Sequence, residues 1–150
     1  MTLRLAANVL AVCASAAFAG AMLFIALALV AYWKSLSPAA FVDWFAANSH
    51  FIGRAMPVFI LPALLGLAAS AWLDWQAPAS RWLWLGALAA ILAVLAVTGL
   101  FHLPANARIA AGAVAPDDIP ALLDRWLWLH VARILFAFAA AILAILAIAR

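Results

Sequence analysis

Residues 125–133 read RWLWLHVAR, and they open the last apolar segment of the chain, residues 134–149, which contains no polar side chain. In a helix, the spacing of Trp126, His130 and Arg133 puts all three side chains on one face. A histidine and an arginine that enter an apolar segment together need a polar cavity to point into, or else the lipid headgroups. The stretch therefore has two interpretations: a buried functional site, or an aromatic and basic belt at a membrane boundary.

The composition of the 150-residue chain indicates which solvent it folds in. Hydrophobic residues make up 73% of the chain and charged residues only 9%, which is more apolar surface than a soluble domain of this length buries. The net charge of +3 comes mostly from basic residues near the ends of apolar segments, which is typical of contact with anionic lipid. We expect one integral membrane domain over residues 1–150, with membrane lipids as partners and no nucleic acid.

Four apolar runs are long enough to cross a membrane as helices. The first run continues past Ala19, where a signal peptide would be cleaved, so we interpret it as a retained span. Leu103 precedes Pro104, so the third helix is expected to end there, and the fourth to begin near Asp118. The fold class is predicted as all-α, a four-span transmembrane helix bundle with spans at about 5–32, 55–73, 82–102 and 127–149.

A short amphipathic helix is predicted between the first two spans, at about residues 38–53. Ser37 suits the N-cap position and Pro38 suits the first helical position. The helix puts His50 and Arg54 on one face. It is therefore either a lid that presents these residues inward or a surface helix with a wet polar face.

All three histidines of the chain are expected at one membrane end, because four spans place both termini together at the other. This asymmetry predicts a polar-mouthed cavity at the histidine end, lined by residues of the third and fourth spans and closed by His50 or Arg54. The basic residues in short flanks, Arg4, Arg81 and Arg150, favour cytoplasmic termini in a bacterial inner membrane. Polar side chains expected at the histidine end are Asn48, His50, Arg54, His102, Asn106, Arg108, His130 and Arg133.

Three local patterns add to the layout of four spans. Pro104-x-Asn106 follows the third span, Trp126-x-x-x-His130-x-x-Arg133 opens the fourth, and a third stretch runs from Tyr32-Trp33 to Pro57. With these patterns the chain resembles, over nearly its whole length, the anthrone-oxygenase-like family of small four-helix membrane proteins, and the third stretch resembles a bacterial branch of it. The resemblance implies that a methylene flanked by aromatic rings becomes a carbonyl, using O2 and no obvious cofactor.

The residues at the histidine end suit such chemistry. A base must form a resonance-stabilised carbanion, and histidine titrates in the right range for this task, so His130 is the candidate base. Arg133 and Asn106 are candidates to hold the developing enolate oxygen, and Trp126 is a candidate wall for a flat substrate. Further substrate contacts are expected from His50, His102, Arg54 and Asn48.

Two other classes of function remain open. Imidazoles bind zinc, copper or iron, so His50, His102 and His130 form an alternative metal- or haem-binding set. Against this set, the histidines come from three separate segments, and no short His-x-x-x-His pair occurs. The third class is a non-enzymatic membrane protein that binds a lipophilic small molecule or a partner, or that forms a homo-oligomer. We expect no resident cofactor.

Overall fold

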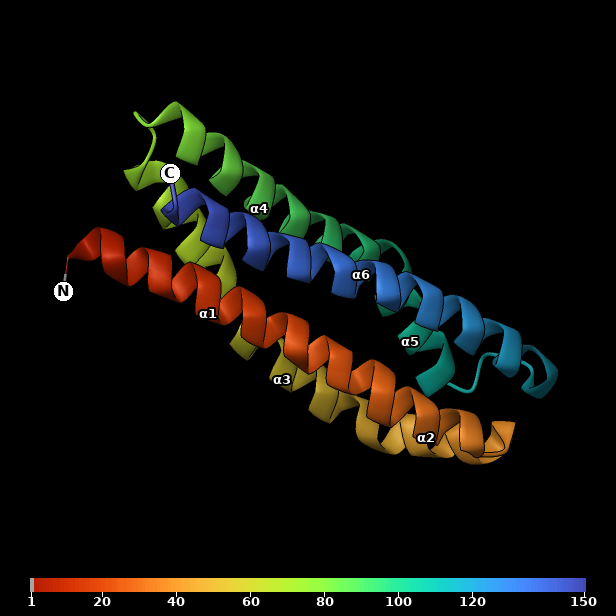
Figure 1. The fold of residues 1–150 in the computed structure, drawn as a ribbon. Coiled ribbons are helices and arrows are strands. Elements are labelled where there is room, and N and C mark those ends of the chain that lie inside the picture. Colours follow the sequence, from red (N-terminus) through yellow and green to blue (C-terminus); the bar gives the residue numbers. More distant parts are fainter. Residues whose placement is uncertain (1) are drawn as a thin grey trace.

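The computed structural model describes residues 2–150, and this part of the chain contains helices and no strand. Within it, four helical runs are long and apolar enough to cross a membrane: Leu3–Ser35, Pro38–Leu73, Pro78–Ala110 and Pro116–Ile148. The predicted all-α, four-span bundle is thus confirmed, and it fits an integral multi-pass membrane protein. Both termini lie at the same end of the bundle (Figure 1).

Some of these runs change helix type along their length. The first run contains α1 (Leu3–Phe24), a π-helical turn η1 (Ile25–Leu29) and α2 (Val30–Ser35). The second is α3 alone (Pro38–Leu73). The third contains α4 (Pro78–Val97), a second π turn η2 (Thr98–His102) and α5 (Leu103–Ala110). The fourth contains a 3₁₀ turn η3 (Pro116–Asp118) and α6 (Ile119–Ile148). Turns of the π type often occur at functional sites.

The separate amphipathic helix expected at about 38–53 is not present. That segment and the expected span at 55–73 form one continuous helix, α3, which begins with Ser37 as N-cap and Pro38 in its first turn, as predicted. Pro57 lies inside the helix and does not end it. A helix break in an apolar solvent leaves several backbone groups unpaired, whereas a proline within a helix removes one hydrogen bond, so the helix continues.

The third run also extends further than the sequence predicted, because Pro104 does not end it. The turn η2 precedes Pro104 and widens the helix locally, which accommodates a residue without a backbone N–H. The run ends instead after Ala110, where Gly112 adopts a φ of 64°. Glycine adopts this left-handed conformation without a steric penalty, and here it closes the helix with a Schellman-type cap.

Two antiparallel pairs make up the bundle, with α1 packed along α3 and α4 packed along α6 (Figure 1). A third contact, between α1 and α6, joins the pairs. The α1–α3 contact is close at Gly66, where an added Cβ would lie 2.5 Å from the backbone nitrogen of Ala11. Small residues let membrane helices approach in this way. The position of α1 therefore depends on glycine at residue 66.

Polar contacts tie the helices together at both ends. At the end that holds the termini, Asp74 accepts a hydrogen bond from the buried Trp84 Nε1 at 2.8 Å and pairs with Arg4 at 3.1 Å. At the other end, Lys34 of α2 pairs with Asp124 of α6. These ion pairs mark the two polar ends of the bundle, and the apolar helices between them span the hydrocarbon layer of about 30 Å.

Candidate functional site

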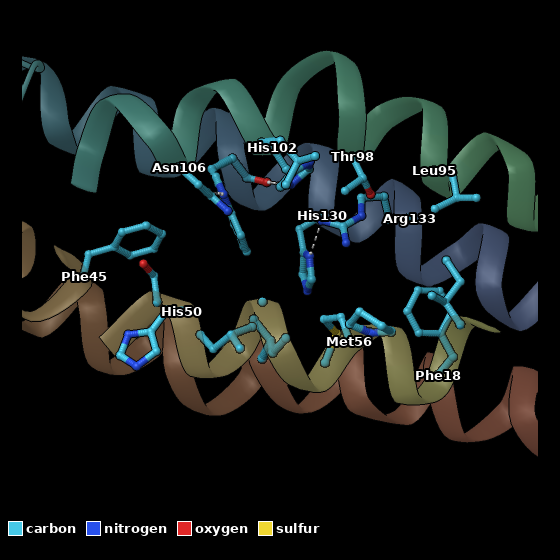
Figure 2. Close-up of a pocket in the computed structure, with 18 of the residues that line it drawn as sticks. Phe18, Phe45, His50, Met56, Leu95, Thr98, His102, Asn106, His130 and Arg133 are labelled. Carbon is cyan, nitrogen blue, oxygen red and sulfur yellow. Dashed lines mark hydrogen bonds between the residues drawn. The ribbon is translucent and has the colours of Figure 1, made fainter. Parts of the chain in front are cut away.

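A cavity of about 410 Å³ lies between α3 on one side and η2, α5 and α6 on the other. Figure 2 shows His130 reaching from α6 toward Met56 of α3. Phe18 and Leu95 lie toward one end of the cavity in this view, and Phe45 lies toward the other. The walls are mostly apolar, with a few polar side chains in the middle, which is the usual composition of a site for a small organic molecule.

His130 projects into this cavity with one ring nitrogen already engaged. Its Nε2 lies 2.8 Å from the main-chain oxygen of Met22, three residues before the η1 turn. A carbonyl oxygen only accepts, so Nε2 carries the proton and Nδ1 of the neutral ring has the free lone pair. The side chain is 1% exposed and stacks on Trp126, with ring centroids 4.7 Å apart and 22° between the planes. The orientation of the imidazole is thus fixed from two sides.

Arg133 lies one turn deeper on α6 and also lines the cavity. It is 7% exposed, and its Nη1 donates to Nδ1 of His130 at 3.4 Å. Its buried Nε has no hydrogen-bond partner among residues 2–150, and the ion pairs found in that part of the chain do not include it. A buried guanidinium without a carboxylate is costly unless an anion or a strong dipole compensates it. The Arg133 guanidinium is therefore suited to bind an oxygen anion.

Trp126 orders the polar groups around it. Its Nε1 donates to Oδ1 of Asn106 at 2.9 Å, and its ring meets that of His102 edge-on, with centroids 4.8 Å apart. An indole N–H only donates, so the Asn106 amide oxygen is the atom it holds, and the amide nitrogen is left for a ligand. Asn106 lines the cavity, and its oxygen is the atom that Trp126 engages.

His102 is as fully buried as His130, whereas His50 is exposed. Its Nδ1 and Nε2 lie 3.4 and 3.3 Å from the main-chain oxygens of Val97 and Trp126, and the side chain is 1% exposed. The ring lies on the π turn η2, and its centroid is 6.0 Å from that of His130. Val97 belongs to the same helical run as His102, so the contact between Nε2 and the Trp126 carbonyl is the one that links the third and fourth helical runs beside the cavity.

The structure brings most of the predicted site residues to one place. His102, Asn106, Trp126, His130 and Arg133 all line the cavity. His50 lines it from α3 and is exposed at its rim, beside Phe51. Two predicted residues are absent from the cavity wall: Arg54, which is exposed on α3, and Asn48, whose amide nitrogen donates to the Trp44 carbonyl at 2.8 Å.

The alternative metal site does not assemble from these side chains. Across residues 2–150, no group of three or more His, Cys, Asp or Glu side chains lies close enough together to hold a metal ion. His102 and His130 are neighbours, but His50 stands apart on α3. The convergent groups of the cavity are a cation, an amide and imidazoles, which suit an oxygen anion.

Sequence reasoning missed part of the cavity wall. The stretch Tyr32-Trp33-Lys34 at the end of the first span is typical of an interfacial anchor, but Trp33 is 1% exposed and packs against Phe45 and Trp126, with ring centroids 5.5 and 5.6 Å away. Aromatic residues near a span end carry the same sequence signature whether they face lipid or core. The signal that distinguishes them is the pairing with Phe41 and Phe45, which lie one turn apart on α3 and form the buried face opposite Trp33.

Comparison with known proteins gives one match. The model of the family described as anthrone oxygenase matches residues 41–143. The matched region contains the cavity residues of α3, α4, η2, α5 and α6, while Phe18, Ile25 and Trp33 of the first helical run lie outside it. No curated protein and no solved structure matches the chain.

Proposed function

This chain belongs to the anthrone oxygenase family, and we propose that it is a membrane oxygenase that acts on a lipophilic aromatic substrate, such as an anthrone or a quinol, without a bound cofactor. The proposal rests on the surroundings of Arg133. A buried guanidinium lines an apolar cavity, and its hydrogen-bond partner within residues 2–150 is a neutral imidazole. Such a group binds an enolate oxygen more strongly than the neutral carbonyl from which the enolate forms, and this difference accelerates the reaction.

The proposed reaction converts a methylene group between two aromatic rings into a carbonyl. A base removes one proton, and the ketone becomes an enolate whose carbon attacks O2. The resulting peroxide takes up a proton and loses water, which leaves the new carbonyl. The methylene thus gives up two hydrogens, one oxygen atom of O2 stays on the carbon, and the other leaves as water. O2 is the oxidant, so no further redox partner is required.

Each cavity residue has a role in this scheme. Nδ1 of His130 accepts the methylene proton, because Nε2 is already protonated and bound to the Met22 carbonyl. The substrate oxygen competes with Nδ1 for the Arg133 guanidinium, so substrate binding frees the base as it engages the cation. The amide nitrogen of Asn106 is a second donor to the oxygen, and the Trp126 ring supports the flat substrate.

The test uses the full chain in lipid nanodiscs supplied with anthrone and O2. The expected result is O2 consumption and anthraquinone formation faster than in protein-free nanodiscs. The matched substrate is 10,10-dimethylanthrone, which keeps the carbonyl but has no methylene hydrogen, and it is expected to bind without consuming O2. If both compounds bind and anthrone is oxidised no faster than without protein, the protein is a binder and the enzyme proposal fails.

The proposal extends to the location of the site. We place the protein in a bacterial inner membrane with both termini in the cytoplasm, because Arg4, Arg81 and Arg150 lie in short flanks at that end. The cavity then faces the outer half of the bilayer. Reporter fusions at the C-terminus test the orientation, and a reporter active only on the outer side contradicts it. Assembly into a homo-oligomer is checked by the mass of the protein–detergent complex.

A further inference from the structure

The residues that line the cavity differ in exposure according to the helix they come from. Those of the first and fourth helical runs, such as Phe18, Trp33 and His130, are buried. The exposed ones come from α3 and from the third run, and they are His50, Gly53, Pro57, Leu95 and Leu103. The exposed part of the cavity wall therefore lies along α3 and the α4–α5 run. We call the gap between Gly53 and Pro57 on α3 and Leu103 on α5 the side opening.

The cavity is closed toward the nearer end of the bundle. Trp33, Phe45 and Trp126 are all at least 95% buried there, with the rings of Phe45 and Trp126 packed against that of Trp33. A molecule arriving from water at that end has to displace this aromatic cluster. The side opening has no such barrier.

The side opening lies at the depth of the apolar helices. Leu103 follows His102, whose Nε2 is 3.3 Å from the Trp126 carbonyl. The side opening is therefore level with Trp126, the first residue of the α6 face that also carries His130 and Arg133. Depth along α6 follows from a rise of about 1.5 Å per residue. His130 lies roughly 8 Å along the helix axis from Arg125, and Arg133 lies roughly 13 Å along it from Asp124, which pairs with Lys34 at the polar end of the bundle. In a bilayer whose hydrocarbon layer is about 30 Å thick, the side opening thus meets lipid chains near one boundary.

The walls of the side opening suit an apolar molecule. Gly53 contributes no side chain, and a Cβ built there meets nothing within 4 Å. Pro57 has no backbone N–H, and Leu103 is 60% exposed and apolar. Apolar walls give a lipid-dissolved molecule a path that requires no desolvation of polar groups. At the inner end of this path stand His130 and Arg133.

We infer that the cavity is loaded from the bilayer through the side opening, and that its ligand is an amphiphile of the membrane. The flat aromatic head carries the oxygen that Arg133 binds, and the apolar remainder of the molecule extends through the side opening among the lipid chains. This inference relies on the proposed function for the identity of the site, but it does not depend on the oxygenation step.

The experiment measures how fast a non-reactive aromatic anion enters and leaves the cavity. The probe is anthracene-9-carboxylate, followed by its fluorescence polarisation after rapid mixing with the protein in nanodiscs. Gly53→Phe and, independently, Leu103→Trp narrow the side opening. We expect each to lower both the association and the dissociation rate at least about tenfold, with a smaller change in the dissociation constant, because an obstructed path slows both directions. Gly20→Phe is the matched control, since Gly20 is exposed on α1 and its added Cβ also meets nothing within 4 Å.

Three results overturn the inference. Rates that remain unchanged in both narrowed variants, together with faster exchange in Phe45→Ala, place the path at the aromatic end. A higher dissociation constant with an unchanged association rate in Gly53→Phe shows that residue 53 only forms part of the cavity wall. Equal slowing in Gly20→Phe indicates a general effect on the membrane. The probe is not oxygenated, so none of these results depends on turnover, and anthrone oxidation that persists alongside them leaves the proposed function standing.

Discussion

Nε2 of His130 donates a hydrogen bond to the main-chain oxygen of Met22 across 2.8 Å, which links the fourth helical run to the first. The bond determines the chemistry of the ring, because it leaves Nδ1 as the nitrogen that can accept a proton. Nδ1 in turn faces Arg133, the group proposed to bind the substrate oxygen. The candidate base and the candidate oxyanion site are thus adjacent. In the proposed scheme, a substrate oxygen competes with Nδ1 for the Arg133 guanidinium.

Replacing His130 with Gln separates the two functions of the ring. A glutamine amide N–H can take the place of Nε2–H toward the Met22 carbonyl, but no basic nitrogen replaces Nδ1. We expect His130→Gln to fold and to bind 10,10-dimethylanthrone, while anthrone turnover falls by about 10²- to 10⁴-fold, the usual contribution of a general base. Binding is measured by equilibrium titration and turnover by O2 uptake.

His130→Leu is the companion variant. It also removes the hydrogen bond to Met22, so we expect an additional loss of about 0.5–1.5 kcal/mol in the free energy of unfolding. Wild-type turnover in His130→Gln would show that another group is the base.

Arg133→Met tests the cation. Methionine fills an apolar cavity, and removing a buried charge that lacks a carboxylate costs no ion pair, so we expect thermal stability equal to or higher than that of the wild type. Hydrogen bonds to a charged group contribute about 1.5–3 kcal/mol, so affinity for anthracene-9-carboxylate should fall about 10- to 100-fold. Arg133→Lys keeps the charge but loses the planar donor geometry, so its affinity for the probe should lie between those of the wild type and Arg133→Met. Unchanged affinity in Arg133→Met would make the residue a structural anchor.

Asn106→Asp tests the second donor. One carboxylate oxygen still accepts from Trp126 Nε1, so the local structure is expected to persist. The other replaces the amide donor with a negative charge. We therefore expect affinity for anthracene-9-carboxylate to fall at least about tenfold, while affinity for uncharged anthracene stays the same. Titrations with the two probes measure this difference, and an equal loss for both would assign Asn106 to packing alone.

Asn106→Leu serves as the contrast. It leaves the buried indole N–H without a partner, which costs about 1–3 kcal/mol, so its main effect should appear in thermal unfolding.

Much of the fold could be predicted from apolar run lengths, because lipid permits few ways of pairing backbone groups. The spacing of Trp126, His130 and Arg133 likewise predicted that they share one face of α6, since a 3.6-residue period places them together. It left open whether that face meets a site or the lipid headgroups, and in the structure all three are buried. What failed were the predictions that relied on local breakers. Pro104 was expected to end the third helix, but it lies inside a continuous helical run, because ending a helix in lipid costs more than one missing hydrogen bond.

The cavity wall was only partly predictable, because exposure depends on how helices pair. The sequence does not predict that α4 packs along α6 while α3 makes few contacts with α6. That arrangement leaves room for the cavity between α3 and α6. Asn48 and Arg54 share the expected membrane end with His50, yet only His50 lines the cavity. Placement at one end of a bundle is a property of chain order, whereas convergence on one cavity is a property of packing.

Gly66 provides the last test, and it connects helix packing with the site. A Cβ at this position lies 2.5 Å from the nitrogen and 2.7 Å from the Cα of Ala11, and backbone atoms cannot rotate out of the way. We therefore expect Gly66→Leu to lower the free energy of unfolding by about 1–3 kcal/mol or more, the usual range for overpacked interiors. Gly20→Leu is the control, because its Cβ meets nothing within 4 Å and leucine favours the helix by up to about 1 kcal/mol over glycine.

The same substitution should affect turnover, because α1 carries the Met22 carbonyl that orients His130. Pushing α1 away from α3 moves that carbonyl relative to α6, so anthrone oxidation should fall in Gly66→Leu even where the variant remains folded. Thermal unfolding in nanodiscs and O2 uptake below the unfolding temperature measure the two effects separately. A variant that is as stable as Gly20→Leu would contradict the close α1–α3 contact. A destabilised variant with unchanged turnover would instead show that the His130–Met22 bond does not depend on the position of α1.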